Sequence, residues 1–368
     1  MPFPNTWILR YNGAYNYMTA HASSSKTIVA SHRVFPETLA ALGEIGNVNA
    51  PNPRQQFAKP QLHKLAKNAD AFLAFMPDKI DDAWLLRAPR LRMIAAALKG
   101  YDNFDLDACT RRGIWVSNVP DLLTAPTSEL TIGLMISLAR KIRAGDSRIR
   151  KSGQSKWQPD LYGTGICGST VGLIGMGMIG IAIAERLQGF GATLLYFEKR
   201  PIEKNLETKL KLTRCALPEL LPRCDFLVIA VPLNTGTYHL LNDEALATCK
   251  PGALLINPAR GSVVDEAAVI RALESGQLSG YAADVFACED LSLAGHPKSI
   301  PSRLLKHPAT LFTPHLGSAV ASVRRDIELR AAANIADWAC GRPPRDAINH
   351  PMQRKITIAS VSSKSAAG

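Results

Sequence analysis

Short apolar runs alternate with longer helical patterns along this chain, from about residue 27 to about residue 345. Each run gives way to polar or glycine-containing residues, as buried parallel strands do. Strands that alternate with helices form parallel sheets covered by helices, so the pattern predicts an α/β fold with two doubly wound parallel sheets. The runs expected as strands form an earlier and a later set: 27–29, 71–75, 93–98 and 114–116, then 170–174, 193–196, 226–231, 253–256, 281–285 and 310–312.

A strongly apolar helical pattern separates the two sets of runs. Pro126 lies in its first turn, apolar residues continue at helical spacing to Ile142, and Gly153 lies just past its end. A helix that is apolar nearly all round is usually buried, so we expect a spine between domains or a dimer element. A second helix is expected over about 319–340, where glycine and prolines then stop it.

Charge and composition limit the partners of the chain. Its 43 Lys and Arg outnumber 31 Asp and Glu, which gives a formal net charge of +12. The sequence has no basic helix and no arginine stripe interleaved with aromatic residues, so we interpret the charge as a basic surface and expect no nucleic-acid partner. An anionic substrate would still benefit from the positive field.

Cysteine and histidine spacing gives no sign of a metal site. The seven cysteines are scattered without a Cys-x-x-Cys pair, so neither a disulfide framework nor a zinc site is expected.

The longest nearly apolar run, 171–184, contains four glycines and is too short to span a bilayer. No basic segment followed by an apolar one opens the chain, so no secretory signal is expected. Together these features predict a cytoplasmic protein with reduced thiols and no membrane partner.

Residues 175–180 read Gly-Met-Gly-Met-Ile-Gly and match the dinucleotide-binding fingerprint. They lie between a strand run and a helical pattern, which is the context that the fingerprint requires. Gly175 permits the tight turn, Gly177 lets the pyrophosphate approach the backbone, and Gly180 lets the helix pack closely on the strand. The phosphates would lie over the N–H groups of the helix start, at Met178 and Ile179. The motif therefore predicts a Rossmann domain.

Glu198 comes just after the next strand run, 18 residues past Gly180. Its carboxylate can accept hydrogen bonds from the adenosine ribose and would repel a 2′-phosphate, so NAD is favoured over NADP. Lys199 and Arg200 follow directly, and either can partner a 2′-phosphate. The use of NADP therefore stays open.

Three ionisable residues follow strand runs in the second half of the chain: Arg260 after Asn-Pro-Ala, Glu289 after Asp-Val-Phe-Ala-Cys, and His315 after Thr-Pro. Parallel sheets build their sites at the carboxyl ends of strands, so we expect these side chains to meet. Metal-free hydride transfer to a nicotinamide requires a cation for an anionic substrate, an imidazole for the proton and a carboxylate to orient it.

The order of these motifs resembles the D-isomer-specific 2-hydroxyacid dehydrogenase family over about residues 27–345. The resemblance implies that Arg260 binds the substrate anion, that His315 takes and gives the proton, and that Glu289 orients His315. It also implies that Asp284 contacts the nicotinamide carboxamide. Further cofactor contacts are implied at Thr127, Pro232 and Ala259.

The family resemblance also implies an architecture. A Rossmann domain is expected over 123–315, inserted in a discontinuous flavodoxin-like substrate domain that spans 26–122 and 316–349. The cleft would lie at the two crossings, and two copies would form a homodimer. Residues 1–25 and 350–368 are expected as an N-terminal arm and a flexible tail.

Lys99 narrows the resemblance to one branch of the family. It lies in Ala-Leu-Lys-Gly-Tyr-Asp-Asn-Phe-Asp, residues 97–105, where the family usually has small residues. This segment, with 74–78 and 157–165, is similar to the phosphite (phosphonate) dehydrogenases. A second cation beside Arg260 suits a small dianion, although most lysines point to solvent. The branch implies further residues near the substrate: Met76, Gly100 and Ser318, an aromatic wall of Trp157 and Tyr162 (core packing being the alternative), and Arg324 in the outer shell.

The branch implies NAD-dependent oxidation of phosphite to phosphate. Hydride would pass from the P–H bond to C4 of the nicotinamide while His315 deprotonates a water, and Arg260 and Lys99 would hold the phosphite oxygens. Two alternatives stay open. One is a D-2-hydroxyacid dehydrogenase that uses the same residues on an alcohol carbon, and the other is an NAD-sensing corepressor that works by binding a protein partner.

Overall fold

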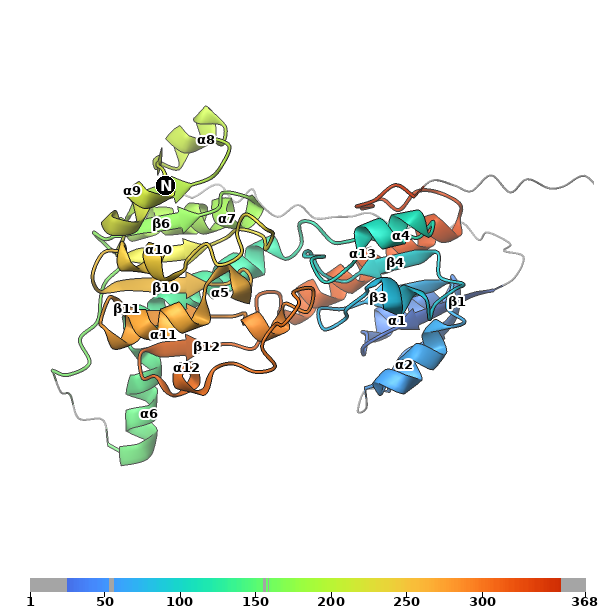
Figure 1. The fold of residues 1–368 in the computed structure, drawn as a ribbon, viewed down its shortest axis with the longest axis horizontal. Coiled ribbons are helices and arrows are strands. Elements are labelled where there is room, and N and C mark those ends of the chain that lie inside the picture. Colours follow the sequence, from blue (N-terminus) through green and yellow to red (C-terminus); the bar gives the residue numbers. More distant parts are fainter. Residues whose placement is uncertain (1–24, 53–55, 155–156, 158, 352–368) are drawn as a thin grey trace, which may run out of the picture.

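A computed structural model describes residues 25–52, 56–154, 157 and 159–351 of the chain. Within them the chain forms two α/β domains, and helix α13 (Ala321–Ala339) leads from one into the other (Figure 1). This arrangement confirms the predicted fold class. The arm expected over 1–25 and the tail expected over 350–368 fall outside the described residues, apart from Ser25, His350 and Pro351.

The first domain is built on a five-stranded parallel sheet in the order β2-β1-β3-β4-β5, which is the doubly wound flavodoxin-like order. Helix α13 buries Ile327, Ala331 and Ile335 against this sheet, so the end of the chain completes the domain. Its elements are β1 (Lys26–Ala30), α1 (Pro36–Gly43), β2 (Gly46–Asn49), α2 (Lys59–Ala66), β3 (Ala71–Ala74), α3 (Asp82–Leu85), β4 (Met93–Ala96), α4 (Leu106–Arg111) and β5 (Trp115–Ser117).

The second domain has a seven-stranded parallel sheet in the order β12-β11-β10-β9-β6-β7-β8. The order reverses between β6 and β9, and ligands of doubly wound sheets bind at such a switch point. Its strands are β6 (Thr170–Ile174), β7 (Thr193–Phe197), β8 (Leu212–Arg214), β9 (Phe226–Ile229), β10 (Ala253–Asn257), β11 (Leu278–Ala283) and β12 (Thr310–Phe312). Its helices are α5 (Thr124–Ala139), α6 (Ile142–Ser152), α7 (Met178–Leu187), α8 (Lys204–Lys209), α9 (Leu217–Leu220), α10 (Asp243–Ala247), α11 (Glu266–Glu274) and α12 (Ser302–Lys306), with short 3-10 turns η1 (Gln188–Phe190), η2 (Leu221–Arg223), η3 (Gly261–Val263) and η4 (Ala287–Glu289).

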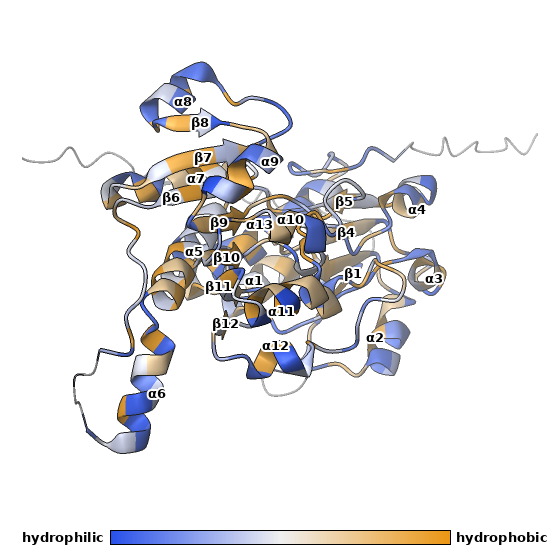
Figure 2. Ribbon diagram, turned by 60° about the vertical axis from the view of Figure 1, so that its left-hand side comes forward, coloured by the Kyte–Doolittle hydropathy of each residue, from blue (hydrophilic) through white to orange (hydrophobic). Residues whose placement is uncertain are grey.

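Both sheets are covered by helices, and their central strands are apolar throughout. Every residue of β3 and of β9 is buried, which explains why these strands read as continuous apolar runs and not as alternating ones. Figure 2 shows hydrophobic colour on the strands and on α5, and hydrophilic colour on outer helices such as α8. The parallel order leaves the loops at the carboxyl ends of the strands as the places where polar side chains gather.

Two strands were missed by the sequence prediction, and both are sheet edges. β2 reads Gly-Asn-Val-Asn, and β8 reads Leu-Thr-Arg, so neither contains a run of apolar residues. An edge strand in a covered sheet has one neighbour and more solvent, so it does not need a continuous apolar sequence. The number of strands was therefore underestimated at the edges and correct in the interior.

The prediction of one buried helix from Pro126 to Gly153 was wrong. The helix breaks after Ala139, Lys141 takes a left-handed backbone conformation with φ 51°, and α6 begins at Ile142. α6 has no buried residue, because charged side chains surround its two isoleucines. It projects from the second domain below α5 (Figure 1). Only the first half, α5, is the buried spine, and it packs on α7, β10 and β11.

The exact domain boundaries, predicted at 122/123 and 315/316, stay predictions. The elements of the structure are compatible with them, since β5 ends at Ser117, α5 begins at Thr124 and β12 ends at Phe312. Among the described residues, no helix combines the length and the apolar character needed to cross a membrane.

Candidate active site

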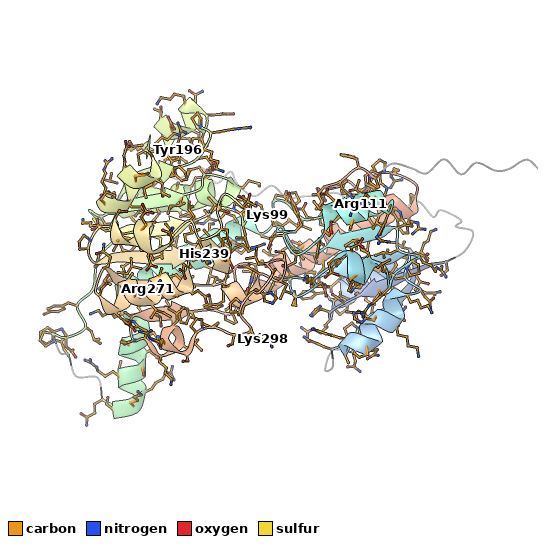
Figure 3. The ribbon with its side chains drawn as sticks, in the orientation of Figure 1. Lys99, Arg111, Tyr196, His239, Arg271 and Lys298 are labelled. Carbon is orange, nitrogen blue, oxygen red and sulfur yellow. The ribbon has the colours of Figure 1, made fainter. Side chains whose placement is uncertain are left out.

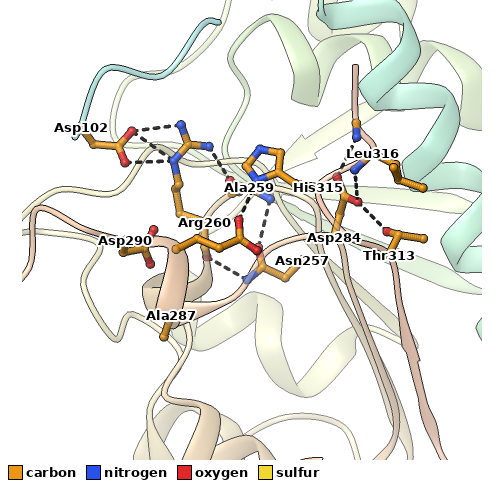
Figure 4. Close-up of polar contacts among 12 residues, drawn as sticks. Asp102, Asn257, Ala259, Arg260, Asp284, Ala287, Asp290, Thr313, His315 and Leu316 are labelled. Atoms are coloured by element: carbon orange, nitrogen blue, oxygen red, sulfur yellow. Dashed lines mark hydrogen bonds and ion pairs between the residues drawn. The ribbon is translucent and has the colours of Figure 1, made fainter. Parts of the chain in front are cut away.

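A small cavity lies between the two domains, where the carboxyl ends of their strands face each other. The first domain contributes Met76, Gly100 and Asp102, and the second contributes Arg260, Glu289, Asp290 and His315. The structure therefore brings together the three residues that the sequence singled out for the chemistry. Figure 4 shows the polar contacts that hold them.

His315 and Glu289 form a hydrogen-bonded pair. The distance from His315 Nδ1 to Glu289 Oε2 is 2.7 Å, and both side chains are half-buried. An ionised carboxylate only accepts hydrogen bonds, so Nδ1 carries the proton of the pair and Nε2 is the atom free to exchange one. This is the geometry of an oriented general acid and base.

The backbone of His315 is strained and is held in place by Asp284. The φ angle of His315 is 56°, a left-handed conformation that costs a non-glycine residue about 1–3 kcal/mol. Its N–H donates to the carbonyl of Asp284 at 2.9 Å, and the Asp284 carboxylate accepts from Thr313, Leu316 and Gly317. Burial raises the pKa of Asp284, while these donors oppose the shift. Asp284 thus braces the turn that carries His315, and its implied contact with a nicotinamide stays a prediction.

Arg260 forms an ion pair with Asp102 across the cleft. Its Nε and Nη2 lie 3.0–3.1 Å from the Asp102 carboxylate, and Nη1 donates to the carbonyl of Ala259 at 2.8 Å. Gly100 lies against the same guanidinium, since a Cβ there would come within 1.6 Å of Arg260 Nη2. Asp102 was not predicted as a site residue, although it begins the Asp-Asn-x-Asp segment. An anionic substrate would have to share the guanidinium with it or replace it.

Two further acids, Glu266 and Asp290, join the turns that carry Arg260 and Glu289. Asp290 follows η4 and accepts from the Ser262 N–H of η3 at 2.7 Å, and Glu266 accepts from the Ala287 N–H of η4 at 2.9 Å. Burial is the main cause that raises the pKa of each acid. The turns touch directly, because a Cβ on Gly261 would lie 1.9 Å from the Phe286 backbone. Neither acid was predicted, and the only sequence signals were that Asp290 directly follows Glu289 and that Glu266 lies six residues after Arg260.

Lys99 lies in the cleft, but its ammonium does not line the cavity. Its Nζ lies 3.7 Å from the Met178 sulfur at the start of α7, while its neighbours Leu98 and Gly100 line the cavity. Figure 3 labels Lys99 between the two domains. Burial lowers the pKa of Lys99, and the charge of Asp121 opposes the shift. The structure therefore places the backbone of this segment, and not the ammonium, beside Arg260.

The other residues expected near the substrate are partly assembled. Met76 lines the cavity at the end of β3. Arg324 of α13 donates to the carbonyl of Ala97 at 3.1 Å and lies 3.5 Å from the Ser318 hydroxyl. These contacts connect α13, the end of β4 and the segment after His315 behind the cavity wall.

The fingerprint glycines fit a dinucleotide. Gly175 has φ 105°, and a Cβ there would lie 2.6 Å from the Ala230 carbonyl, so the turn after β6 requires glycine. A Cβ on Gly180 would lie 2.2 Å from the Gly175 carbonyl, whereas one on Gly177 would meet nothing within 4 Å. Gly177 is the N-cap of the ten-residue helix α7, and the first N–H groups of such a helix, here at Met178 and Ile179, can bind phosphate.

The other residues expected as cofactor contacts lie on three further segments of the second domain. Pro232 lies in the loop after β9, and Ala259 precedes Arg260 after β10. Thr127 is buried in the first turn of α5, with its hydroxyl against Gly317. Thr127 and Asp284 both lie against Gly317, two residues after His315, and the cofactor contacts implied for these residues stay predictions.

The adenosine end of the expected cofactor site holds both an acid and cations. Glu198 accepts from the N–H groups of Met176 at 3.0 Å and of Lys199 at 2.8 Å, so its carboxylate helps to close the fingerprint turn. The Lys199 ammonium lies close to the backbone of Gly236, and Arg214 donates to the carbonyls of Glu198 and Lys199. The geometry offers an acceptor for ribose hydroxyls and an ammonium nearby for a phosphate.

Within one chain, Trp157 and Tyr162 form neither an aromatic wall beside the substrate cavity nor part of a core, which were the two predicted alternatives. Their exposed fractions are 80% and 67%, so neither packs in a core. Tyr162 lines a second cavity at the base of α6, and neither lines the cavity of Arg260 and His315. The reason is that α6, which precedes both residues, projects away from the cleft (Figure 1).

Comparison with known proteins agrees with the geometry. Residues 132–317 match the family described as D-isomer specific 2-hydroxyacid dehydrogenase, NAD binding domain. A glyoxylate reductase from Pyrococcus horikoshii is 37% identical over 296 residues, which cover 78% of this chain and 85% of that protein.

Solved structures show the same fold. The TT0316 protein of Thermus thermophilus superposes with a TM-score of 0.78 at 33% identity and covers 88% of this chain and 100% of its own. An NADPH-dependent glyoxylate/hydroxypyruvate reductase from Sinorhizobium meliloti, in complex with NADP and malonate, has a TM-score of 0.74 at 27% identity and covers 90% and 99% of the two chains.

Proposed function

The chain belongs to the D-isomer-specific 2-hydroxyacid dehydrogenase family, and we propose that within it the protein interconverts a small 2-oxo acid of the size of glyoxylate and the matching 2-hydroxy acid. The observation that carries the proposal is the cavity in which Arg260 lies beside the hydrogen-bonded pair of His315 and Glu289. The names of the relatives support this substrate class over phosphite.

The residues of the cavity divide the work of a reduction. The nicotinamide ring, when bound, supplies the hydride. The Arg260 guanidinium binds the substrate carboxylate and polarises the oxo group, and a protonated His315 donates its Nε2 proton to the oxygen as the alcohol forms. Glu289 stabilises the imidazolium beforehand, and in the oxidation direction His315 takes the proton back. Asp284 holds the imidazole of His315 in position, because its carboxylate fixes the turn that carries His315.

Phosphite oxidation is the second candidate, and Lys99 is the observation that favours it. A monoanionic 2-oxo acid needs one cation, whereas a phosphite dianion would use two. The ammonium lies beside the Met178 sulfur and outside the cavity lining. The two-cation arrangement therefore requires it to turn toward the Arg260 guanidinium, which the next residue, Gly100, touches. In this reaction His315 would take a proton from a water that attacks phosphorus, while the P–H hydride passes to the oxidised nicotinamide, with phosphate as the product.

One panel of assays separates the candidates. NADH oxidation is followed with glyoxylate and hydroxypyruvate, and NADH formation is followed with glycolate, D-glycerate, D-lactate and phosphite. We expect the 2-oxo acids to be turned over best, whereas rapid phosphite turnover without 2-oxo acid reduction would replace the first candidate by the second. Turnover of none of these substrates would contradict both, and it would leave the corepressor as the function to test.

The cofactor that we propose is NAD, because Glu198 offers a carboxylate to the ribose hydroxyls at the end of β7. Lys199 and Arg200 support some use of NADP as well. The same panel run with NADPH measures this directly. A preference for NADPH over NADH would contradict the assignment.

A further inference from the structure

We infer that Asp78 is a positioning residue that fixes the turn presenting Met76 to the substrate cavity. The inference rests on the proposed function, since it assigns Asp78 an effect on the substrate and none on the cofactor. Asp78 does not line the cavity. It acts through the backbone of the turn 75–78, which directly follows β3.

The Asp78 carboxylate closes this turn from inside. Its Oδ2 accepts from the Phe75 N–H at 2.7 Å and from the Ser31 hydroxyl at 2.5 Å, and the Asp78 N–H donates back to the Phe75 carbonyl at 3.0 Å. Met76 lies between the two bonded residues. Its position therefore depends on contacts that all involve Asp78, two of them through its carboxylate.

The neighbouring strand supplies a second anchor. β1 and β3 pair in parallel, and Ser31, the residue after β1, donates its N–H to the Leu73 carbonyl at 3.1 Å. The Ser31 hydroxyl also lies 2.9 Å from His32 Nδ1. Because that hydroxyl donates to Asp78, it accepts from His32, and a chain of hydrogen bonds runs from the imidazole to the carboxylate.

Aromatic and cationic groups hold Phe75, the other end of the turn. The Phe75 ring is buried, its centroid lies 5.5 Å from the His32 ring, and the Arg324 guanidinium lies 5.9 Å from it. Arg324 in turn binds the Ala97 carbonyl and approaches Ser318. The turn is therefore coupled to the end of β4 and to the segment after His315, two other walls of the site.

A carboxylate that accepts several donors while partly buried costs free energy unless those bonds are made. Burial raises the pKa of Asp78, and the donors from Phe75 and Ser31 and the charge of His32 oppose the shift. A purely structural role would need only the stability of the domain. A positioning role predicts a change in substrate binding that is separate from stability, because displacements near 1 Å at a binding wall are enough to weaken binding.

The test compares Asp78→Ala, Asp78→Asn and Ser31→Ala with a control, Asp81→Asn. Asp81 lies three residues on, is 45% exposed and caps α3 through the Trp84 N–H. Asparagine caps a helix as well as aspartate does, so Asp81→Asn removes a nearby carboxylate charge without touching the turn. The assay uses glyoxylate with NADH, or phosphite with NAD if the panel finds only that activity.

We expect Asp78→Ala to raise the substrate KM by about tenfold, with the cofactor KM within about twofold of the wild type. Asp78→Asn keeps a hydrogen-bond acceptor, so its substrate KM should lie between those of the wild type and of Asp78→Ala. Ser31→Ala removes one hydroxyl and should raise the substrate KM by about two- to threefold. Asp81→Asn should leave both KM values unchanged.

An unchanged substrate KM in Ser31→Ala and Asp78→Asn would overturn the inference, and so would equal rises in both KM values. If Asp78→Ala does not fold, the two milder variants still decide. A wild type that turns over no panel substrate would remove the proposed function and the inference together. An active wild type with insensitive variants would remove the inference alone.

Discussion

His315 occupies an unfavourable left-handed conformation, and the residues around it explain why it stays there. Asp284 accepts three hydrogen bonds from the segment 313–317 and receives the His315 N–H on its carbonyl. Strained residues of this kind cluster at functional sites because the surrounding structure over-determines them. The neighbouring Glu289 then sets the ring orientation, so a rigid imidazole faces the cavity.

Lys99 gives the residue-scale prediction that separates the two substrates. Lys99→Ala should raise the KM for phosphite by about tenfold or more, because a charge-assisted contact to the dianion is lost. It should change the KM for glyoxylate by only a few fold, since Arg260 alone serves one carboxylate. Steady-state kinetics with both substrates measures the split. Lys79→Ala, at an exposed lysine paired with Asp81, is the matched control.

Equal sensitivity of glyoxylate and phosphite to Lys99→Ala would contradict this interpretation. It would mean that the ammonium acts on the cofactor, which its contact with Met178 at the start of α7 would then explain. The KM for NADH in the same variant distinguishes that outcome.

The sequence could predict His315, Glu289, Arg260 and the fingerprint glycines because each lies in a local motif at the end of an apolar run. It could not predict Asp102, which reaches Arg260 from 158 positions away and from the other domain. Glu266 and Asp290 were missed for a related reason: their roles depend on two turns lying in contact, and this contact is set by the packing of β10 and β11. Long-range ion pairs leave no periodic signal in a sequence.

The helices and strands match the apolar pattern of the sequence where they are buried, and they depart from it where they are exposed to solvent. The interior strands were predicted because they are buried on both faces, and the edge strands β2 and β8 were not. α5 and α6 read as one helix because Ile142 continues the spacing, yet the charged residues after Ala139 cannot be buried, and the helix breaks at Lys141. Helical periodicity alone does not report such a break.

The end of α13 gives a prediction about stability and pH. The Asp337 carboxylate is 9% exposed and accepts from Arg342 at 2.9 Å and from Arg345 at 2.7 Å. Burial alone would raise the pKa of Asp337, but the hydrogen bonds from Arg345 and Arg342 outweigh it and lower that pKa. Asp337→Asn should therefore lower the free energy of unfolding at pH 7, because the ion pairs with both arginines are lost. The loss should be only about 1 kcal/mol, since the arginines are partly exposed and solvent screens the pairs.

The pH dependence follows from the lowered pKa. The stabilisation is fully present above the unfolded-state pKa of about 4 and is lost as the pH falls through the lower pKa of the folded state. Thermal unfolding of the wild type and of Asp337→Asn between pH 7 and pH 3 should show two curves that converge at the acid end. A constant gap, or no gap at pH 7, would contradict the ion-pair account of this helix end.

At the scale of the whole molecule, two domains meet at a cleft, and helix α6 projects away from it. α6 carries Ile142 and Ile149 at 50% and 52% exposure, and Tyr162 lines the cavity at its base. Exposed apolar side chains on one projecting element are a candidate interaction surface, and we propose that a second copy of the chain covers it. The family resemblance and this surface together favour a pair of identical chains.

Light scattering on the purified protein checks this assembly. We expect a mass of twice the 39.8 kDa of one chain at micromolar concentration. The double variant Ile142→Glu/Ile149→Glu should shift the mass toward that of one chain without loss of helical signal, because charges replace the apolar stripe. A wild type of 39.8 kDa, or a double variant of unchanged mass, would contradict an assembly through α6.

The central claim is that His315 moves the proton that accompanies hydride transfer. The most direct measurement compares turnover by the wild type and by His315→Ala with the best substrate of the panel, alongside NADH binding by fluorescence, with His63→Ala as the control. We predict that turnover falls by about 10²–10⁴-fold while NADH binds normally and the control stays active. Near-normal turnover in His315→Ala would contradict the claim.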